Sequence, residues 1–168
     1  MNDELIAFVN AHDQIIGTKP RSEVHSLGLL HRAVHVLVFN DHRQVFLQKR
    51  SMSKDENPGL WDTSAAGHVD AGESYAMCAA REILEELGIK SNKTMKFLFK
   101  LPASEQTGME FIEVYRMDDN GPFTLATDEI DEGQWFSLSE ISKKVELDDR
   151  DLTDSFKILW RKFETGNS

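Results

Sequence analysis

Three glutamates in the segment from Arg81 to Glu86 have the spacing of metal ligands. Glu82, Glu85 and Glu86 stand at positions i, i+3 and i+4 of a predicted helix, so their carboxylates share one helix face. Like charges at this spacing repel, whereas a solvated helix more often alternates glutamate with lysine. Carboxylate oxygens suit Mg²⁺ or Mn²⁺, and a divalent cation would turn the repulsion into binding. A solvated acidic face explains such a helix when it is taken alone, so the neighbouring residues decide.

The neighbouring residues favour a metal site. A glycine precedes the helix, a tight turn follows that glycine, and one arginine lies among the acids, where it can hold a carboxylate in a fixed orientation. Small residues on the helix allow it to approach a sheet closely. The spacing is Gly67, five residues, Glu73, seven residues, Arg81-Glu82-Ile83, one residue, Glu85-Glu86, one residue, Gly88-Ile89.

This spacing, over residues 67–89, resembles the Nudix box at every defined position. The resemblance implies Mg²⁺, or Mn²⁺, held by Glu82, Glu85, Glu86 and the backbone carbonyl of Ala66 or Gly67, with Glu73 and Arg81 orienting these ligands. It also implies hydrolysis of a nucleoside diphosphate linked to another group, in which a metal-activated water attacks phosphorus.

The resemblance also implies a general base, either a carboxylate of the helix, Glu85 or Glu86, or one on a distant segment. Glu113, Glu129 and Glu132 are the candidates for the distant carboxylate. We select Glu113 because it lies in an apolar strand, where an unpaired charge is costly. An outward side chain on a half-exposed strand explains Glu113 equally well.

Outside the box the chain is similar to isopentenyl-diphosphate isomerase, in the stretches Leu30-His31-Arg32-Ala33, Pro58-Gly59-Leu60-Trp61 and Gly67-His68. This resemblance implies a second metal held by His25, His31 and His68 with glutamates near Glu113, and such ligands favour Zn²⁺ or Mn²⁺. Taken singly, each histidine also has an ordinary explanation as a strand-start, turn or capping residue.

Two departures argue against isomerase chemistry. Ala66 occupies the position of the isomerase's catalytic cysteine, and alanine transfers no proton. Phe111 occupies the position of the second glutamate, and Cys78 lies inside the predicted helix, where we expect it to be packed and inert. We therefore expect a diphosphate hydrolase. The alternatives are an isomerase-type enzyme and a non-catalytic protein that keeps the fold and binds a nucleotide.

Composition sets limits on the function. The 168 residues suit one domain, and the net charge of −10 argues against a nucleic-acid polymer as partner. We expect a small phosphorylated substrate, with Lys49 and Arg50 as its best candidate phosphate contacts. The single cysteine, the acids Asp3 and Glu4 near the start, and the absence of a long apolar run predict a cytoplasmic protein without a membrane span.

The predicted elements give an α+β fold, an α/β/α sandwich with a mixed central sheet. An N-terminal hairpin over residues 5–18 leaves a strand edge at which two copies of the chain could pair. The helix that carries the glutamates begins at Glu73 or Ser74, runs to Leu87 and ends at Gly88. The other predicted elements are a short helix or turn over 20–26, strands over 31–40, 44–50, 61–66, 95–101, 109–117 and 133–136, and helices over 137–145 and 151–163.

Overall fold

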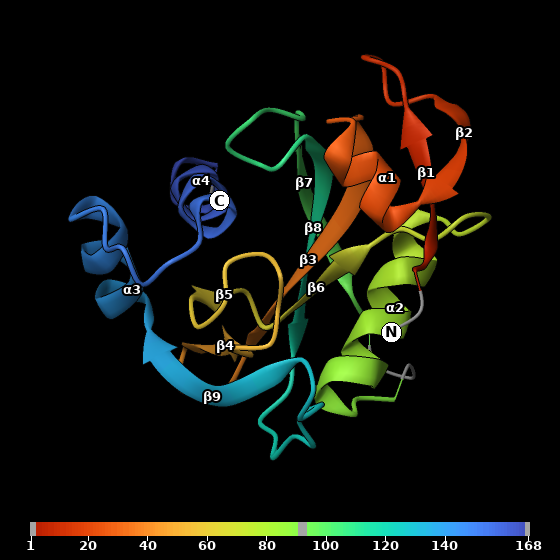
Figure 1. Cartoon of the computed structure of the whole chain (residues 1–168). Helices are drawn as coiled ribbons and strands as arrows, with labels where there is room; N and C mark the ends of the chain where they lie inside the picture. Colours follow the sequence, from red (N-terminus) through yellow and green to blue (C-terminus); the bar gives the residue numbers. More distant parts are fainter. Residues whose placement is uncertain (1–2, 91–93, 167–168) are drawn as a thin grey trace.

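A computed structural model describes residues 3–90 and 94–166 of the chain (Figure 1). The strands among them form one mixed sheet, and helices lie on both of its faces. The strands are β1 (Leu5–Val9), β2 (Ile15–Pro20), β3 (His31–Phe39), β4 (Gln44–Arg50), β5 (Trp61–Asp62), β6 (Ala65–His68), β7 (Lys96–Leu101), β8 (Glu110–Asp118) and β9 (Ile130–Ser137). The helices are α1 (Arg21–Ser26), α2 (Tyr75–Leu87), α3 (Leu138–Glu146) and α4 (Asp154–Thr165).

Strand β3 organises the sheet. It pairs in parallel with β8 along its whole length and antiparallel with β6 over Ala33–Val36. It pairs with β4 only at Val38 and Phe39, so β3 and β4 separate beyond that point. Strands β5 and β6 lie in the space between them, because β5 pairs with β4 and β6 pairs with β3. The gap between β3 and β4 is where the candidate site is built.

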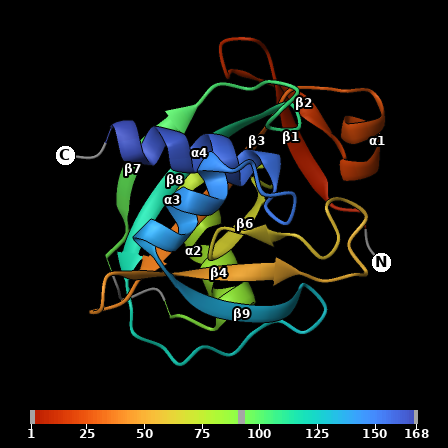
Figure 2. The ribbon, with the colours of Figure 1, turned by 90° about the vertical axis from the view of Figure 1, so that its left-hand side faces the viewer.

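Alternation along β3 divides the core into two layers. Val34, Val36 and Val38 face α2, with Ile83 and Leu87 of that helix. Leu37 and Phe39 face α3 and α4, with Trp160 of α4 among their partners. Figure 2 shows α3 and α4 in front of the sheet and α2 behind it. The structure thus confirms the predicted α+β fold with its mixed sheet. No helix among the described residues is long and apolar enough to cross a membrane.

Several predicted boundaries needed correction. The predicted strand over 61–66 is two strands, because Asp62 pairs with β4 whereas Ala65 pairs with β3. The hydroxyl of Ser64 lies at the crossing, where it accepts from Val38 N and donates to Phe46 O. The last helix begins at Asp154 rather than Asp151, because the Thr153 side chain caps it. Strand β9 begins three residues earlier than predicted, at Ile130.

Candidate metal sites

Helix α2 positions the predicted glutamates. Its N-cap is Ser74, whose side chain accepts from Met77 N, and it ends at Gly88, which adopts the left-handed conformation at φ 71°. The apolar stripe of α2 packs on the sheet, and Glu82 and Glu86 lie within the buried part of the helix, with only 7% and 6% of their surfaces exposed. Glu85 is exposed, since its side chain points to solvent beside Arg81.

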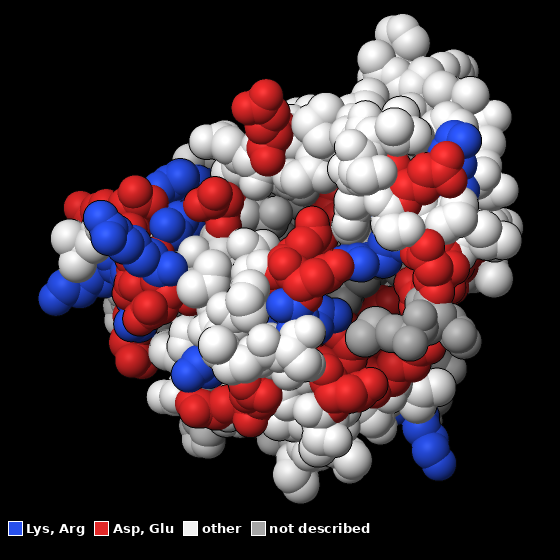
Figure 3. Space-filling model, in the orientation of Figure 1, with Lys and Arg blue, Asp and Glu red and all other residues white. Residues whose placement is uncertain are grey.

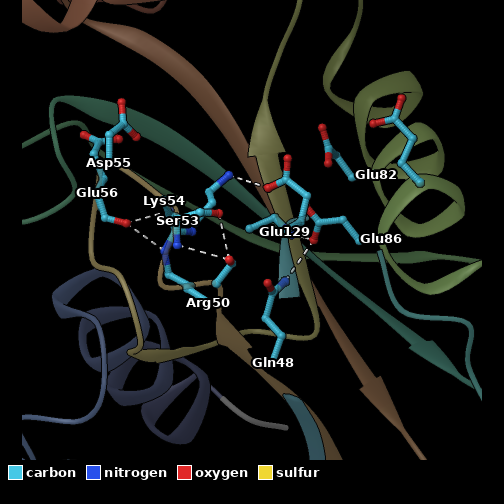
Figure 4. Close-up of polar contacts among 12 residues, drawn as sticks. Gln48, Arg50, Ser53, Lys54, Asp55, Glu56, Glu82, Glu86 and Glu129 are labelled. Carbon is cyan, nitrogen blue, oxygen red and sulfur yellow. Dashed lines mark hydrogen bonds and ion pairs between the residues drawn. The ribbon is translucent and has the colours of Figure 1, made fainter. Parts of the chain in front are cut away.

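Glu86 is held by two neutral donors. Its Oε1 accepts from the side-chain amide of Gln48 on β4 at 2.9 Å and from the backbone N–H of Ala66 on β6 at 3.1 Å. Figure 4 shows Gln48 below Glu86, with Glu82 on the adjoining turn of the helix. Glu86 is therefore bound to both strands that line the gap in the sheet.

Glu82 lies directly over Gly67. A Cβ atom at position 67 would stand 2.2 Å from the Glu82 carboxyl carbon, so only glycine leaves room for this carboxylate. On its other side Glu82 accepts from Arg81 Nη1 at 2.7 Å. Arg81 also donates to both carboxylate oxygens of Glu73, at 2.7 and 2.9 Å, and lies 3.3 Å from Asp70. The predicted orienting residues therefore do meet around the predicted ligands.

The two buried carboxyls favour their protonated forms. Burial raises the pKa of Glu82, and the neighbouring Glu86 raises it further. Burial also raises the pKa of Glu86, although the hydrogen bonds from Gln48 and Ala66 oppose that shift. Two ionised carboxylates at this depth need a counter-cation, and only oxygen ligands converge here. The site therefore fits a hard divalent cation such as Mg²⁺ or Mn²⁺.

The loop between β4 and β5 lies beside these carboxylates. Lys54 on this loop forms an ion pair with Glu129, which lies next to Glu86 (Figure 4). Arg21 of α1 holds the loop from the other side through Asp55, at 3.1 and 3.2 Å. On the face shown in Figure 3, acidic side chains gather over this loop and beside α2, with Lys and Arg among them.

The structure does not support Lys49 and Arg50 as the predicted phosphate contacts. Alternation along β4 turns Lys49 to the face opposite Gln48. The Arg50 guanidinium donates twice to the backbone carbonyl of Glu56, at 2.8 and 3.0 Å, and so holds the loop. Lys54 is the basic side chain that the loop directs toward the α2 glutamates.

Four other side chains form a second cluster at the end of β3. His25, His31, His68 and Glu110 each offer one ligand atom, and these atoms lie within 4.8 Å of one another. The three imidazole centroids form a near-regular triangle with sides of 5.1, 5.1 and 5.2 Å. The predicted trio of histidines is therefore brought together from α1, β3 and β6, and a cavity of about 230 Å³ opens beside His25 and His31.

Hydrogen bonds turn the Nε2 atoms of this cluster inward. Nδ1 of His31 lies 2.8 Å from the Leu29 carbonyl, which can only accept, so the Nδ1 atom carries the proton and Nε2 faces Glu110 at 3.3 Å. Nε2 of His68 lies 2.8 Å from the same carboxylate oxygen. Nε2 of His25 is buried and has no hydrogen-bond partner. The Nε2 atoms of His31 and His68 converge on one carboxylate oxygen beside an unpartnered buried nitrogen, and after loss of their protons such nitrogens fit a metal bound by imidazole.

The electrostatics of the second cluster agree with this arrangement. Burial alone would raise the pKa of Glu110, but the hydrogen bonds to His31 and His68 hold it well below its usual range. Burial opposes protonation of His31, yet the Glu110 contact raises the pKa of that imidazole. Burial lowers the pKa of His25. In the absence of a metal, a proton on His31 balances the Glu110 charge.

Glu110 was missed in the sequence, and Glu113 was misplaced. Glu110 pairs with His31 in the β3–β8 register, and alternation gives Glu110, Ile112 and Val114 one face of β8. Glu113 lies on the opposite face, where it accepts from the Tyr115 hydroxyl at 2.6 Å and lies 4.0 Å from Lys100. Glu113 therefore contacts neither the histidines nor the α2 glutamates. The alternation of side chains along β8 was the signal that could have identified Glu110.

Cys78 is buried in α2, and burial raises the pKa of its thiol, as expected for an inert cysteine. Its sulfur contacts the backbone carbonyl of His68 at 3.3 Å. Because this thiol is buried within α2 and faces the backbone of β6, it does not substitute for a thiol at position 66.

Comparisons with known proteins find matches over most of the chain. A profile described as the NUDIX domain matches residues 29–156. The chain is 37% identical over 135 residues to an uncharacterized Nudix hydrolase of Pseudomonas aeruginosa, covering 79% of this chain and 78% of that protein. It is 31% identical over 148 residues to isopentenyl-diphosphate Delta-isomerase 2 of Aromatoleum aromaticum, covering 86% and 78%.

Solved structures show the same fold. A crystal structure of a protein from Deinococcus radiodurans superposes with a TM-score of 0.85 at 23% identity and covers 95% of this chain and 98% of that one. Relatives by sequence thus include both hydrolases and isomerases, so the activity has to be argued from the side chains.

Proposed function

The chain belongs to the NUDIX domain family, and from that premise we propose that it is a divalent-metal-dependent hydrolase of an organic diphosphate, with a nucleoside diphosphate joined to another group as the main substrate class. The observation that carries this proposal is the buried pair of Glu82 and Glu86, which lies over Gly67 and is held by Gln48, Ala66 N and Arg81. A protein that only bound a nucleotide would have no need of such a costly pair.

In this proposal Glu82 and Glu86 hold Mg²⁺ or Mn²⁺ together with Glu85 and the backbone carbonyl of Ala66. The bound cation would neutralise the diphosphate and acidify a water molecule. Arg81 keeps Glu82 oriented, and Glu73 keeps Arg81 oriented, since the guanidinium donates to both carboxylates. Glu85 lies at the exposed end of the cluster, and its carboxylate would complete the set of oxygen ligands.

Lys54 on the loop between β4 and β5, and Glu129 just before β9, supply the remaining groups. Glu129 lies next to Glu86 and near enough to raise the pKa of that carboxyl, so we assign it, rather than Glu113, as the distant carboxylate that accepts the proton of the attacking water. Lys54 pairs with Glu129 and would exchange that partner for a phosphate oxygen of the substrate.

Isomerase activity is disfavoured by one residue. The side chain at position 66 is a methyl group, and His35 is its neighbour in the β3–β6 register. Neither the described part of β6 nor the buried Cys78 offers a thiol at that place. The histidine cluster nevertheless fits a Zn²⁺ or Mn²⁺ ion through its unpartnered His25 nitrogen, and we include it as a second metal site that is independent of the hydrolytic one.

The deciding experiment is a substrate panel. Nucleotide sugars, dinucleotides, coenzyme A, thiamine diphosphate and isopentenyl diphosphate are each incubated with the protein in Mg²⁺ or Mn²⁺. We expect hydrolysis of at least one diphosphate. The Glu86→Gln variant should lose this activity while its circular dichroism spectrum, which reports the fold, stays unchanged. Conversion of isopentenyl diphosphate to dimethylallyl diphosphate would support the isomerase instead. Binding of a nucleotide without turnover would support the non-catalytic alternative.

A further inference from the structure

Gln48 is a buried polar side chain whose surroundings are unusual for a β-strand residue. It lies on β4 with 4% of its surface exposed, outside the segment 67–89 that carries the α2 glutamates. Its amide nitrogen donates to the backbone carbonyl of Ser64 at 3.2 Å and to Glu86 Oε1 at 2.9 Å (Figure 4). Both partners are acceptors, so the nitrogen, and not the amide oxygen, has to face them.

The Ser64 carbonyl therefore fixes the orientation of the Gln48 amide. If the amide were reversed, its oxygen would face a carbonyl oxygen and a carboxylate oxygen in a buried place, which is costly. With the amide so fixed, its second proton points at Glu86 Oε1. The Ala66 N–H points at the same oxygen from β6, at 3.1 Å. Oε1 thus receives a donor from each strand that borders the gap in the sheet.

The other carboxylate oxygen of Glu86 receives neither of these donors. We propose that Gln48 is a positioning residue, which engages Glu86 Oε1 and thereby presents Oε2 to the cation. This inference rests on the proposed metal site and deepens it, since it assigns one oxygen of Glu86 to the metal and the other to the protein frame. A neutral donor suits this role because it orients the carboxylate without cancelling the charge that the cation needs.

The test measures Mg²⁺ binding directly by calorimetry, at fixed pH and without substrate. Mg²⁺ prefers oxygen ligands, so the titration reports the glutamate site rather than the histidine cluster. Gln48→Met keeps the length of the side chain and removes the amide. We expect its dissociation constant for Mg²⁺ to rise about tenfold or more, as when other groups that orient metal ligands are removed. With a substrate found in the panel, turnover at saturating Mg²⁺ should recover most of its wild-type value.

Gln44→Met is the matched control. Gln44 lies on the same strand and accepts from the Asn40 side chain, but it contacts no residue of α2. Both variants lose a partly or fully buried hydrogen bond, so urea unfolding in EDTA shows the structural cost of each. Only Gln48→Met should lose Mg²⁺ affinity. Unchanged Mg²⁺ affinity in Gln48→Met would overturn the inference, provided that Glu86→Gln loses binding. Wild-type affinity in Glu86→Gln would instead overturn the proposed metal site itself.

Discussion

Arg81 donates a hydrogen bond to the backbone carbonyl of His68, with 3.1 Å between Nη2 and the oxygen. This bond joins the two candidate sites. Arg81 holds Glu82 on α2, and the side chain of His68 contacts Glu110 in the histidine cluster. Gly67 and His68 are successive residues of β6, so they point to opposite sides of the strand. One short strand therefore lies under the glutamate site and contributes a ligand to the histidine site.

Replacing Arg81 tests how much its hydrogen bonds between the two candidate sites stabilise the fold. Arg81→Met leaves Glu73 and Glu82 without a cationic partner, and we expect the free energy of unfolding to fall by roughly 2–3 kcal/mol. Arg81→Lys keeps the charge but not the planar fork, so it should lose less. Urea unfolding measures both. Lys19→Met, which breaks an exposed pair with Glu23, should change stability by less than about 0.5 kcal/mol. Equal effects in all three variants would contradict the prediction.

Gly67→Ala should weaken metal binding while the fold remains. The added Cβ would overlap the Glu82 carboxylate, which must then leave the site. We expect Mg²⁺ affinity to fall by about tenfold or more, because one ligand is displaced. Gly17→Ala is the control, since its Cβ would meet the Phe8 ring in the hairpin, 3.0 Å away, and no carboxylate. Calorimetric titration that gives wild-type Mg²⁺ affinity in Gly67→Ala would refute the placement of Glu82.

The stability of the metal-free protein should depend on pH in a defined direction. Burial and the proximity of Glu86 raise the pKa of Glu82, and burial raises that of Glu86, above the ordinary 4.5. The stability that their protonated forms contribute is therefore complete below that value and is lost as pH rises through the raised values. In EDTA, the melting temperature of the wild type should fall between about pH 5 and pH 9 by more than that of Glu82→Gln.

Mg²⁺ should reverse this loss of stability, because it binds the ionised carboxylates. The increase in melting temperature on adding Mg²⁺ is expected to be larger at high pH than at low pH. Scanning calorimetry of the wild type and Glu82→Gln, each in EDTA and in Mg²⁺, gives the comparison. Identical pH profiles for the two proteins in EDTA would show that Glu82 does not carry the raised pKa.

Two glutamates of β8 distinguish the histidine site from its surroundings. Glu110→Gln removes the charged ligand and should lower Zn²⁺ or Mn²⁺ affinity about tenfold or more, whereas Glu113→Gln should leave it unchanged. Metal content after dialysis against Zn²⁺, determined by atomic absorption, measures the difference. His68→Ala should behave like Glu110→Gln. Equal retention of metal in Glu110→Gln and the wild type would contradict the proposed metal site at the histidines.

The sequence by itself determined which residues gather at α2. The glutamates, Arg81 and Gly67 lie within one strand–turn–helix unit, so helical periodicity and the need for a glycine under a carboxylate are local properties that spacing can express. The capping residues Ser74 and Gly88 could be predicted for the same reason, because helix capping depends on residues next to the helix ends. The layered α+β fold followed from the order of alternating and helical patterns, since these periods decide which side chains are buried.

Only the tertiary structure decided the partners that come from distant strands. Gln48 and Ala66 meet Glu86 because β3 and β4 separate and β6 occupies the gap, and no local pattern records that separation. The choice of Glu110 over Glu113 depended on the register of β8 against β3, where a shift of one residue exchanges the two faces. The partners of the long basic side chains were likewise not predictable, because the partner of Arg50 is a backbone carbonyl that only the folded loop brings near it.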